Sequence, residues 1–390
     1  MDRRGRLFPS LLVLLAIVLA FAVGFVFAQS TSQPTTGLPG EFARLGEVWQ
    51  YLDRYYVNQT ALDPEELSQA AIEGLLDALD DPYTSYIDAE LYELEWSAFE
   101  GSFEGIGAVV TMDDGQLTVV SPIAGGPAEE QGVRTGDWIV EIDGEPTEGM
   151  GLAEAVLKIR GAQGTTVSLL IIHLGEITPV AIDIVREEIT LDSVHLDMLA
   201  GDIAHIQITH FSERTDKEMV VVLNEALDDG ARAIVLDLRN NPGGYLSVVV
   251  NVADEFLDGG TVLYQRDTEG ALDESKASPG GLATDLPIVV LVNESSASGS
   301  EVLAGALQDR GRAPLVGTTT YGKGSVNVMI ELSDGSAIYV TVAHWLTPNG
   351  NLIEGQGLTP DFEVELSADD IANDRDPQLD FALEHVSSEL

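Results

Sequence analysis

The sequence predicts an α/β protein, in which a layered α/β core is joined to a small mixed-β domain and preceded by a helical segment. Over residues 188–366, short apolar strands alternate with amphipathic helices, which is typical of a layered sheet with at least partly parallel strands. Residues 103–187 instead combine short strands, glycine turns and one amphipathic helix. The 390 residues are 45% apolar and 22% charged, which indicates a folded globular chain rather than a disordered one.

The first residues predict export from the cytoplasm. Three arginines within the first six residues precede a nearly unbroken apolar run over 11–28. Residues 1–28 therefore have the pattern of a signal peptide, and the run is also long enough to be retained as a membrane anchor, so both alternatives stay open. The positive flank places everything that follows on the extracytoplasmic side. Residues 29–40, rich in Ser, Thr, Pro and Gly, predict a flexible linker.

Helical segments flank the two predicted domains. Residues 41–102 place apolar side chains at helical spacing, with a second helix starting at Asp63-Pro64 and a short third helix over 89–99. The C-terminal tail, 367–390, predicts an acidic amphipathic helix. Small helices cannot bury such apolar faces alone, so we expect a homodimer, with docking onto the same chain as the alternative.

The charge and the cysteine count exclude several classes of function. The chain has 65 Asp and Glu against 19 Lys and Arg, a formal net charge of −46. Such a surface repels phosphate backbones and anionic headgroups, which excludes nucleic-acid partners and limits membrane contact to the N-terminal segment. The absence of cysteine excludes thiol nucleophiles and disulfides. The histidines show no metal-ligand spacing, so we expect neither metal nor cofactor.

Three segments that follow apolar strands of the core are candidates for chemistry. The first contains the pair Gly243-Gly244, whose backbone N–H groups could face a developing oxyanion. The second is a strand-to-helix turn with four serines, one of them Ser298, and chemistry alone does not choose among them. The third holds Lys323, one of only four lysines, between two glycines. A lysine sheltered from water has a lowered pKa and can act as a base.

Two rival interpretations of these segments fail or stay weak. Residues 317–325 nearly spell a phosphate-binding loop, but Gly324 stands where a hydroxyl must reach magnesium, and a strand rather than a helix follows. Nucleotide binding is therefore rejected. A histidine-dependent hydrolase would need a base among six histidines, none of which lies in a motif. These histidines are His173, His195, His205, His210, His344 and His385.

Taken together, the segments resemble the carboxyl-terminal processing peptidases, or tail-specific proteases, which are PDZ-containing serine–lysine endopeptidases. The most specific match lies in several pieces within residues 292–326, and residues 347–350 and 355–361 resemble the closing signature of the family. By the same resemblance, 103–187 is similar to a PDZ domain and 188–366 to the serine protease core. The resemblance implies that the peptide carboxylate binds a loop formed by Gly105, Ile106, Gly107 and Ala108.

The resemblance also implies catalytic roles. Ser298 would be the nucleophile and Lys323, neutral before attack, its general base. The oxyanion would accept from the N–H of Gly299 and from one N–H of the pair Gly243-Gly244. In many relatives a glutamine four residues after the lysine orients it, whereas Asn327 stands there in this chain. Gly299 likewise replaces the alanine that follows the nucleophile in the family.

These inferences predict an extracytoplasmic serine endopeptidase. Its PDZ domain would bind protein or peptide substrates by their free, apolar C-termini, and the pair Ser298 and Lys323 would cleave them. The alternative is a catalytically weak PDZ scaffold that only holds C-terminal tails. Asn327 favours the scaffold, whereas the intact serine and lysine favour the peptidase.

Overall fold

The computed structural model describes residues 39–89, 91–92, 101–113 and 115–390. The segment predicted as signal peptide or anchor and most of the predicted linker lie outside the described residues, as does most of the third N-terminal helix. The chain divides into two compact units, residues 1–71 and 72–390, which are considered separately. Within the described ranges, no helix is long and apolar enough to cross a bilayer.

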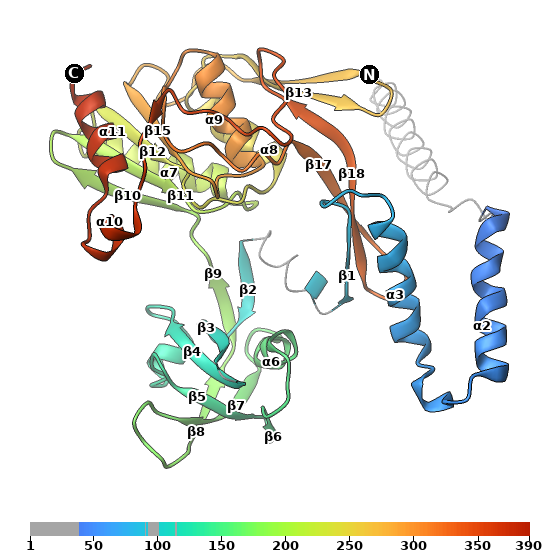
Figure 1. The fold of residues 1–390 in the computed structure, drawn as a ribbon. Helices are drawn as coiled ribbons and strands as arrows, with labels where there is room; N and C mark the ends of the chain where they lie inside the picture. The colour runs from blue at the N-terminus through green and yellow to red at the C-terminus, as the bar shows by residue number, and fades with distance from the viewer. Residues whose placement is uncertain (1–38, 90, 93–100, 114) are drawn as a thin grey trace, which may run out of the picture. The chain divides into compact units, whose positions relative to one another are not determined.

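The N-terminal helices carry apolar side chains without burying them. Helix α2 (Ala43–Tyr55) follows a short 3-10 turn, and α3 (Pro64–Asp77) runs across the boundary between the units. No residue of either helix is buried. Helix α2 exposes the large apolar side chains of Leu45, Val48 and Tyr51, each more than half accessible. The helical spacing predicted for this region is therefore confirmed for two helices (Figure 1). Their apolar side chains are not buried.

The small β domain is built on an antiparallel sheet of order β3-β4-β5-β7-β8, with β6 added on β5. Helix α6 packs on this sheet through the buried side chains of Ala155 and Ile159. A separate two-stranded ladder, β2 with β9, joins the entry and exit of the domain. Its elements are β2 (Ser102–Gly105), β3 (Ala108–Asp113), β4 (Gln116–Pro122), α5 (Pro127–Glu130), β5 (Trp138–Ile142), β6 (Glu145–Pro146), α6 (Leu152–Ile159), β7 (Thr166–Ile172), β8 (Val180–Val185) and β9 (Glu187–Thr190).

The core contains a six-stranded sheet of order β10-β11-β12-β15-β16-β19. Every neighbouring pair is parallel except β10 with β11. This agrees with the predicted layered arrangement. The strands are β10 (Val194–Leu199), β11 (Ile203–Ile208), β12 (Ala233–Asp237), β15 (Ile288–Val292), β16 (Leu315–Gly317) and β19 (Phe362–Glu363), and the helices are α7 (Thr215–Asp228), α8 (Leu246–Asp254), α9 (Gly299–Asp309), α10 (Ala368–Ala372) and α11 (Pro377–Ser387).

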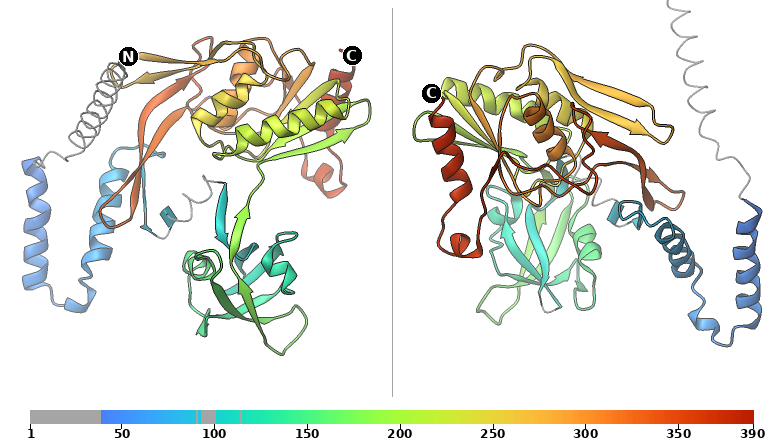
Figure 2. Two further views of the ribbon diagram at one scale, coloured as in Figure 1. Left: turned by 180° about the vertical axis from the view of Figure 1, so that it is seen from behind. Right: turned by 45° about the horizontal axis from the view of Figure 1, so that its top comes forward.

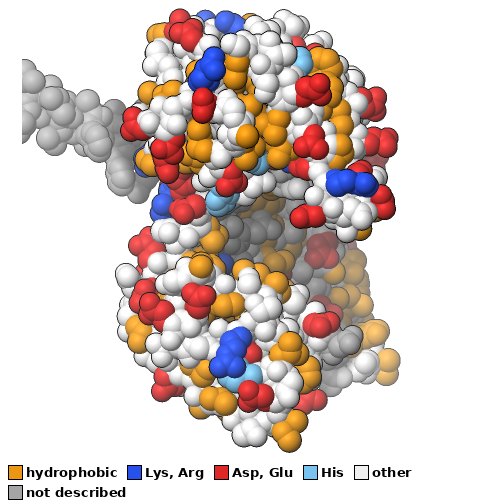
Figure 3. All heavy atoms as spheres, turned by 90° about the vertical axis from the view of Figure 1, so that its left-hand side faces the viewer, with side chains coloured by type: hydrophobic (Ala, Val, Ile, Leu, Met, Phe, Trp, Pro, Cys, Tyr) orange, Lys and Arg blue, Asp and Glu red, His pale blue; other side chains and the backbone are white. Residues whose placement is uncertain are grey.

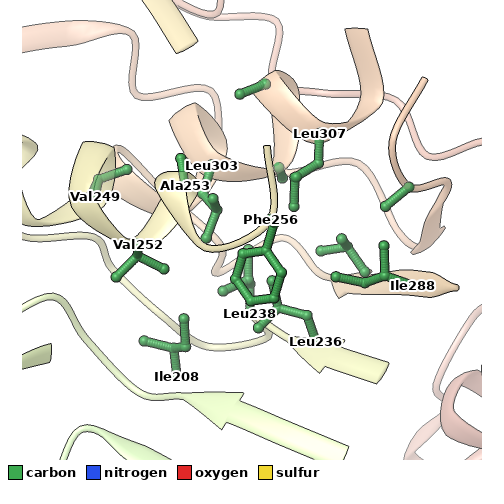
Figure 4. Close-up of a cluster of buried hydrophobic side chains, with 14 of the residues drawn as sticks. Ile208, Leu236, Leu238, Val249, Val252, Ala253, Phe256, Ile288, Leu303 and Leu307 are labelled. Carbon is green, nitrogen blue, oxygen red and sulfur yellow. The ribbon is translucent and has the colours of Figure 1, made fainter. Parts of the chain in front are cut away.

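Helices cover both faces of this sheet because successive strand residues point to opposite sides. In β12, Ile234 and Leu236 join the larger apolar cluster with helices α7, α8 and α9, whereas Val235 joins the smaller cluster with α11. Figure 4 shows the larger cluster around Phe256, and Figure 2 shows α11 beside the sheet. The result is a three-layer α/β/α core.

A second, antiparallel sheet of order β1-β18-β13-β14, with β17 on β18, completes the core. The sequence predicts strands over 325–331 and 337–343; β17 has the first range, and β18 covers the second but runs on to Leu346. The sequence did not predict β1, β13 or β14. Figure 3 shows acidic side chains spread over one face of the molecule, as the net charge requires. The strands are β1 (Ser85–Ile87), β13 (Gly260–Asp267), β14 (Leu272–Ala277), β17 (Ser325–Glu331) and β18 (Ala337–Leu346).

Candidate active site

Ser298 occupies a strained turn between strand β15 and helix α9. It is the N-cap of α9 and has φ 52° and ψ −113°, a backbone conformation that non-glycine residues rarely adopt. Strain of this kind costs about 1–3 kcal/mol and persists where the surrounding structure holds it, often at functional sites. The turn places the serine at the carboxyl edge of the parallel sheet, where ligands bind in open α/β sheets.

Hydrogen bonds distinguish among the four serines that the sequence left open. The Ser296 hydroxyl donates to the Leu238 carbonyl at 2.8 Å, and the Ser300 hydroxyl donates to the Asn241 carbonyl at 2.9 Å. Both serines are completely buried. They therefore fasten the turn to the loop after β12, whereas Ser298 is only partly buried.

The glycine pair after β12 lies directly against the Ser298 turn. A Cβ atom on Gly243 would lie 2.7 Å from the Gly299 nitrogen and 2.8 Å from the Ser298 Cβ atom. The Gly243 N–H donates to the Asn241 side chain at 2.8 Å. No hydrogen bond between described residues uses the N–H of Gly244 or of Gly299. The two candidate oxyanion segments are thus in contact, and two backbone donors there have no described acceptor.

A buried carboxylate, that of Glu301, joins the serine turn to the lysine segment. One oxygen accepts from the Thr320 hydroxyl at 2.5 Å and the Gly322 N–H at 2.7 Å. The other accepts from the Ser298 N–H and the Lys323 N–H, each at 2.9 Å. Burial raises the pKa of Glu301, and the four hydrogen bonds oppose that shift. Two main-chain segments from different elements are therefore fixed to one side chain.

The sequence interpretation gave Glu301 no role. The available signal was its spacing, because a Glu three residues after a Ser at a helix start is the pattern of a capping box. The bond from the Ser298 N–H to the Glu301 carboxylate is one half of that pattern. The Glu301 carboxylate also accepts from the lysine segment, about twenty positions later in the chain, and no local sequence pattern predicts that contact.

The lysine segment packs between close backbone neighbours. A Cβ atom on Gly322 would lie 2.9 Å from the Gly357 nitrogen, and one on Gly324 would lie 2.2 Å from the Glu354 nitrogen. The flanking glycines are therefore required by the close approach of residues 354–357, which overlap the second segment that resembles the closing signature. Lys323 itself is partly buried.

Asn327 ties the lysine strand to a distant segment. Its side-chain amide donates to the Tyr83 carbonyl at 2.9 Å and to the Thr341 hydroxyl at 3.1 Å. Its side-chain oxygen accepts from the Ser325 hydroxyl at 3.1 Å. A β-bulge between Val326 and Asn327 bends the strand at this point.

The loop after β12 is anchored by an ion-pair network. Arg239 contacts the buried Asp237 at 2.7 Å and Asp376, the N-cap of α11, at 2.9 Å. Burial opposes ionisation of Asp237, but hydrogen bonds from His205 and Arg239 lower its pKa overall. The same two aspartates raise the pKa of Arg239 against the effect of burial. The C-terminal helix is thereby connected to the start of the loop that carries the glycine pair.

The predicted peptide-binding loop opens the β domain. Gly107 has φ +70°, and Ile106 is buried in the domain core. The carbonyl of Ile106 accepts from Ala128, and that of Gly107 from Ile123. Strand β3 begins at Ala108 and is the edge strand of its sheet. An edge strand beside a left-handed glycine can pair with an extended peptide.

Metal ligation has no support in the described part of the chain, where no group of three or more His, Cys, Asp or Glu side chains could hold an ion. The constellation instead combines a strained serine, a partly buried lysine and two backbone N–H groups that no described residue accepts. These are the components of nucleophilic acyl transfer. The fold and the site together define a hydrolase core with an attached peptide-binding domain.

Comparison with known proteins identifies both domains. The model for peptidase family S41 matches residues 202–364, and the PDZ domain model matches 118–172. The model described as the activating protease CtpB N-terminal domain matches 26–91. The chain is 36% identical over 371 residues to carboxy-terminal processing protease CtpA of Bacillus subtilis, covering 94% of this chain and 78% of that protein.

Two further similarities agree with this match. The carboxyl-terminal-processing protease of Synechocystis sp. is 38% identical over 345 residues, covering 86% of this chain and 80% of that protein. The solved structure of a photosystem II D1 C-terminal processing protease aligns with a TM-score of 0.50 at 29% identity, covering 84% and 94%. The chain belongs to peptidase family S41, as a serine-type carboxy-terminal processing protease with a PDZ domain. The predicted fold class, family and enzyme class are confirmed.

Proposed function

We propose that this protease is an extracytoplasmic endopeptidase that binds the free, apolar C-terminus of a protein substrate in its PDZ domain and cleaves with the dyad Ser298 and Lys323. The observation that carries the proposal is the position of Glu301. Its buried carboxylate accepts the backbone N–H groups of both dyad residues at 2.9 Å. A structural serine turn alone would not require a common anchor with the lysine segment.

The proposed reaction begins with a neutral lysine. The Lys323 amine takes the Ser298 hydroxyl proton as the Oγ atom attacks the substrate carbonyl, and the resulting ammonium returns the proton to the leaving amine. Water then hydrolyses the acyl-enzyme by the same route. The oxyanion accepts from the N–H groups of Gly299 and Gly244. Gly244 is preferred over Gly243 because the Gly243 N–H already donates to Asn241.

Asn327 has a supporting role in this scheme. Its amide bonds to Tyr83 and Thr341 hold the strand that follows Lys323 against its neighbours. The β-bulge beside it provides the bend that a contact across four strand residues needs, because regular strand residues that far apart are separated by about 13 Å at Cα.

Tail recognition would occur at the edge of strand β3. The backbone of Gly105, Ile106, Gly107 and Ala108 would hold the terminal carboxylate, while the free edge of β3 pairs with the peptide. Amidating the C-terminus of a substrate should therefore slow its cleavage at least several-fold. Equal rates for free and amidated tails would contradict this mode of recognition.

The location and the assembly rest on the N-terminal region. The arginine-flanked apolar run over 11–28 supports export, with the core outside the cytoplasm. The exposed apolar face of α2 supports a homodimer. Light scattering of the chain in moderate salt should show a dimer at micromolar concentration, because salt screens the charge of −46 per copy.

The catalytic proposal is tested with matched variants. Labelled casein, an unfolded protein, is incubated with the wild type, Ser298→Ala and Lys323→Arg. Both variants should lose nearly all turnover, because guanidinium does not release its proton at working pH. The controls are Ser295→Ala, an exposed serine of the same turn, and Lys276→Arg, an exposed lysine elsewhere. Near-wild-type rates for Lys323→Arg would refute the dyad, and tail binding without any cleavage by the wild type would favour the scaffold.

A further inference from the structure

The segment before the β domain is bonded into the sheet that carries the lysine. Asp81 accepts from the Tyr83 N–H at 3.0 Å and from the Thr84 hydroxyl at 2.6 Å. The Thr84 hydroxyl oxygen accepts from the Thr341 N–H at 3.2 Å. Strand β1 then continues as an antiparallel partner of β18. Tyr83 is therefore held in place by bonds on both sides of it in the sequence.

Tyr83 faces the lysine segment with both its backbone and its side chain. Its carbonyl accepts from the Asn327 amide at 2.9 Å. The Lys323 Nζ atom lies over the Tyr83 ring, 5.6 Å from the ring centroid. This distance is within the range in which an aromatic face attracts a cation. The two contacts are independent, and they bring one residue to both ends of the bend between Lys323 and Asn327.

The charged groups near Tyr83 and Lys323 come from several elements of the fold. Glu301 lies on α9, His344 on β18, and Glu354 in the loop that packs against Gly324. Among the described residues, Glu354 keeps one buried carboxylate oxygen without a hydrogen-bond partner. Asp81 and Tyr321 complete the set that acts on Tyr83. Burial, reinforced by Glu354, Tyr321, Glu301 and Asp81, raises the pKa of Tyr83, so its phenol stays neutral at working pH.

We propose that Tyr83 is a positioning residue for the general base: its ring face holds the Lys323 amine in place and stabilises the ammonium that forms when the Ser298 proton is taken. This inference rests on the proposed function of Lys323. It makes the segment 81–84, which precedes the PDZ domain, part of the active site. A neutral ring suits this role because it attracts a cation without forming a salt bridge that would fix the lysine in its charged form.

The test is the pH dependence of kcat/KM on labelled casein, measured with the full chain. Removing the ring in Tyr83→Leu disfavours the ammonium, so the midpoint of the activity rise should move to lower pH by about 0.5–1 unit. Tyr83→Phe keeps the ring and should keep the wild-type midpoint. Tyr86→Leu, on the adjacent strand β1, is the matched control and should leave both rate and midpoint unchanged.

A second pair of variants tests the same role if Tyr83→Leu does not fold. Phenylalanine at position 83 is compared with its trifluorinated analogue, which has nearly the same shape but a weaker negative ring face. The fluorinated ring should shift the midpoint in the same direction as Tyr83→Leu. If neither folded variant shifts the midpoint while Lys323→Arg is inactive, the role of Tyr83 is refuted and the dyad stands. If Lys323→Arg is active, the proposed function itself fails.

Discussion

Replacement of Glu301 by glutamine tests the link between the two halves of the site. Glutamine has almost the same shape as glutamate but only one side-chain acceptor oxygen. In the native site, one carboxylate oxygen accepts from Thr320 and Gly322, and the other from Ser298 and Lys323. Whichever way the amide is turned, its NH₂ group faces two donors. Two of the four bonds are therefore lost.

The magnitude follows from that count. Each buried donor left without an acceptor costs about 1–3 kcal/mol, so two cost about 2–6 kcal/mol. A neutral amide is easier to bury than a carboxylate, and this recovers part of the loss. We expect Glu301→Gln to lower the free energy of unfolding of the core by about 2–4 kcal/mol. We also expect kcat to fall by more than tenfold, because the serine turn and the lysine segment lose their common anchor.

Urea unfolding monitored by tryptophan fluorescence gives the stability, and casein cleavage gives kcat. The matched control is Glu294→Gln, in the same turn, whose exposed carboxylate accepts a single bond from the Thr318 hydroxyl at 3.0 Å. This control should change stability by less than about 0.5 kcal/mol. If Glu301→Gln matches the control in both measurements, the carboxylate does not hold the site together and the reasoning is wrong.

Three further predictions follow from single contacts. Gly299→Ala should reduce kcat/KM, because its methyl group would lie 2.8 Å from the Val249 side chain, and adding Val249→Ala should restore part of the rate in a double-mutant cycle. Burial lowers the pKa of His210 from 6.5 despite the nearby Glu218. Because the unfolded chain then binds a proton more readily than the folded one, this histidine's contribution to the free energy of unfolding is present above pH 6.5 and is lost as the pH falls. His210→Gln should therefore flatten the fall in the urea midpoint between pH 7 and pH 5. Asp376→Asn should lower kcat several-fold with KM unchanged, because Arg239 would hold the loop after β12, which carries the candidate oxyanion glycines, less firmly; an equal change in KM would contradict this.

Local sequence patterns were sufficient to predict most of the strands and helices of the fold. Residues 233–238, apolar except for Asp237, and the apolar run over 287–292 predict buried strands, and β12 and β15 lie there. Strand β1 was missed because it is three residues long and pairs only with β18, some 250 positions later. The hairpin of β13 and β14 was missed because its second strand is largely polar and exposed. Such strands are stabilised by their partners rather than by their own composition.

The candidate site shows the same division between local and distant information. The resemblance selected Ser298 and Lys323, but residue chemistry alone left four serines equivalent. The burial of Ser296 and Ser300, each bonded to a carbonyl of the loop after β12, supplies a physical reason to exclude them. In the same way, the bond from Gly243 to Asn241 separates two glycines that the sequence could not distinguish.

Asn327 shows why the spacing of a motif is not enough to predict which residues are in contact. Residues four apart on a regular strand are separated by about 13 Å at Cα, so the spacing alone does not bring the short Asn327 side chain to Lys323. The structure shows that the Asn327 amide reaches the Tyr83 carbonyl, 244 positions earlier in the chain, while the Lys323 amine lies over the ring of that same tyrosine. A substitution that looks like a defect in the local motif is therefore one half of a joint contact with Tyr83. In the proposed mechanism, the orientation of the base therefore depends on a segment that precedes the PDZ domain, and inspection of the lysine motif alone cannot reveal that contact.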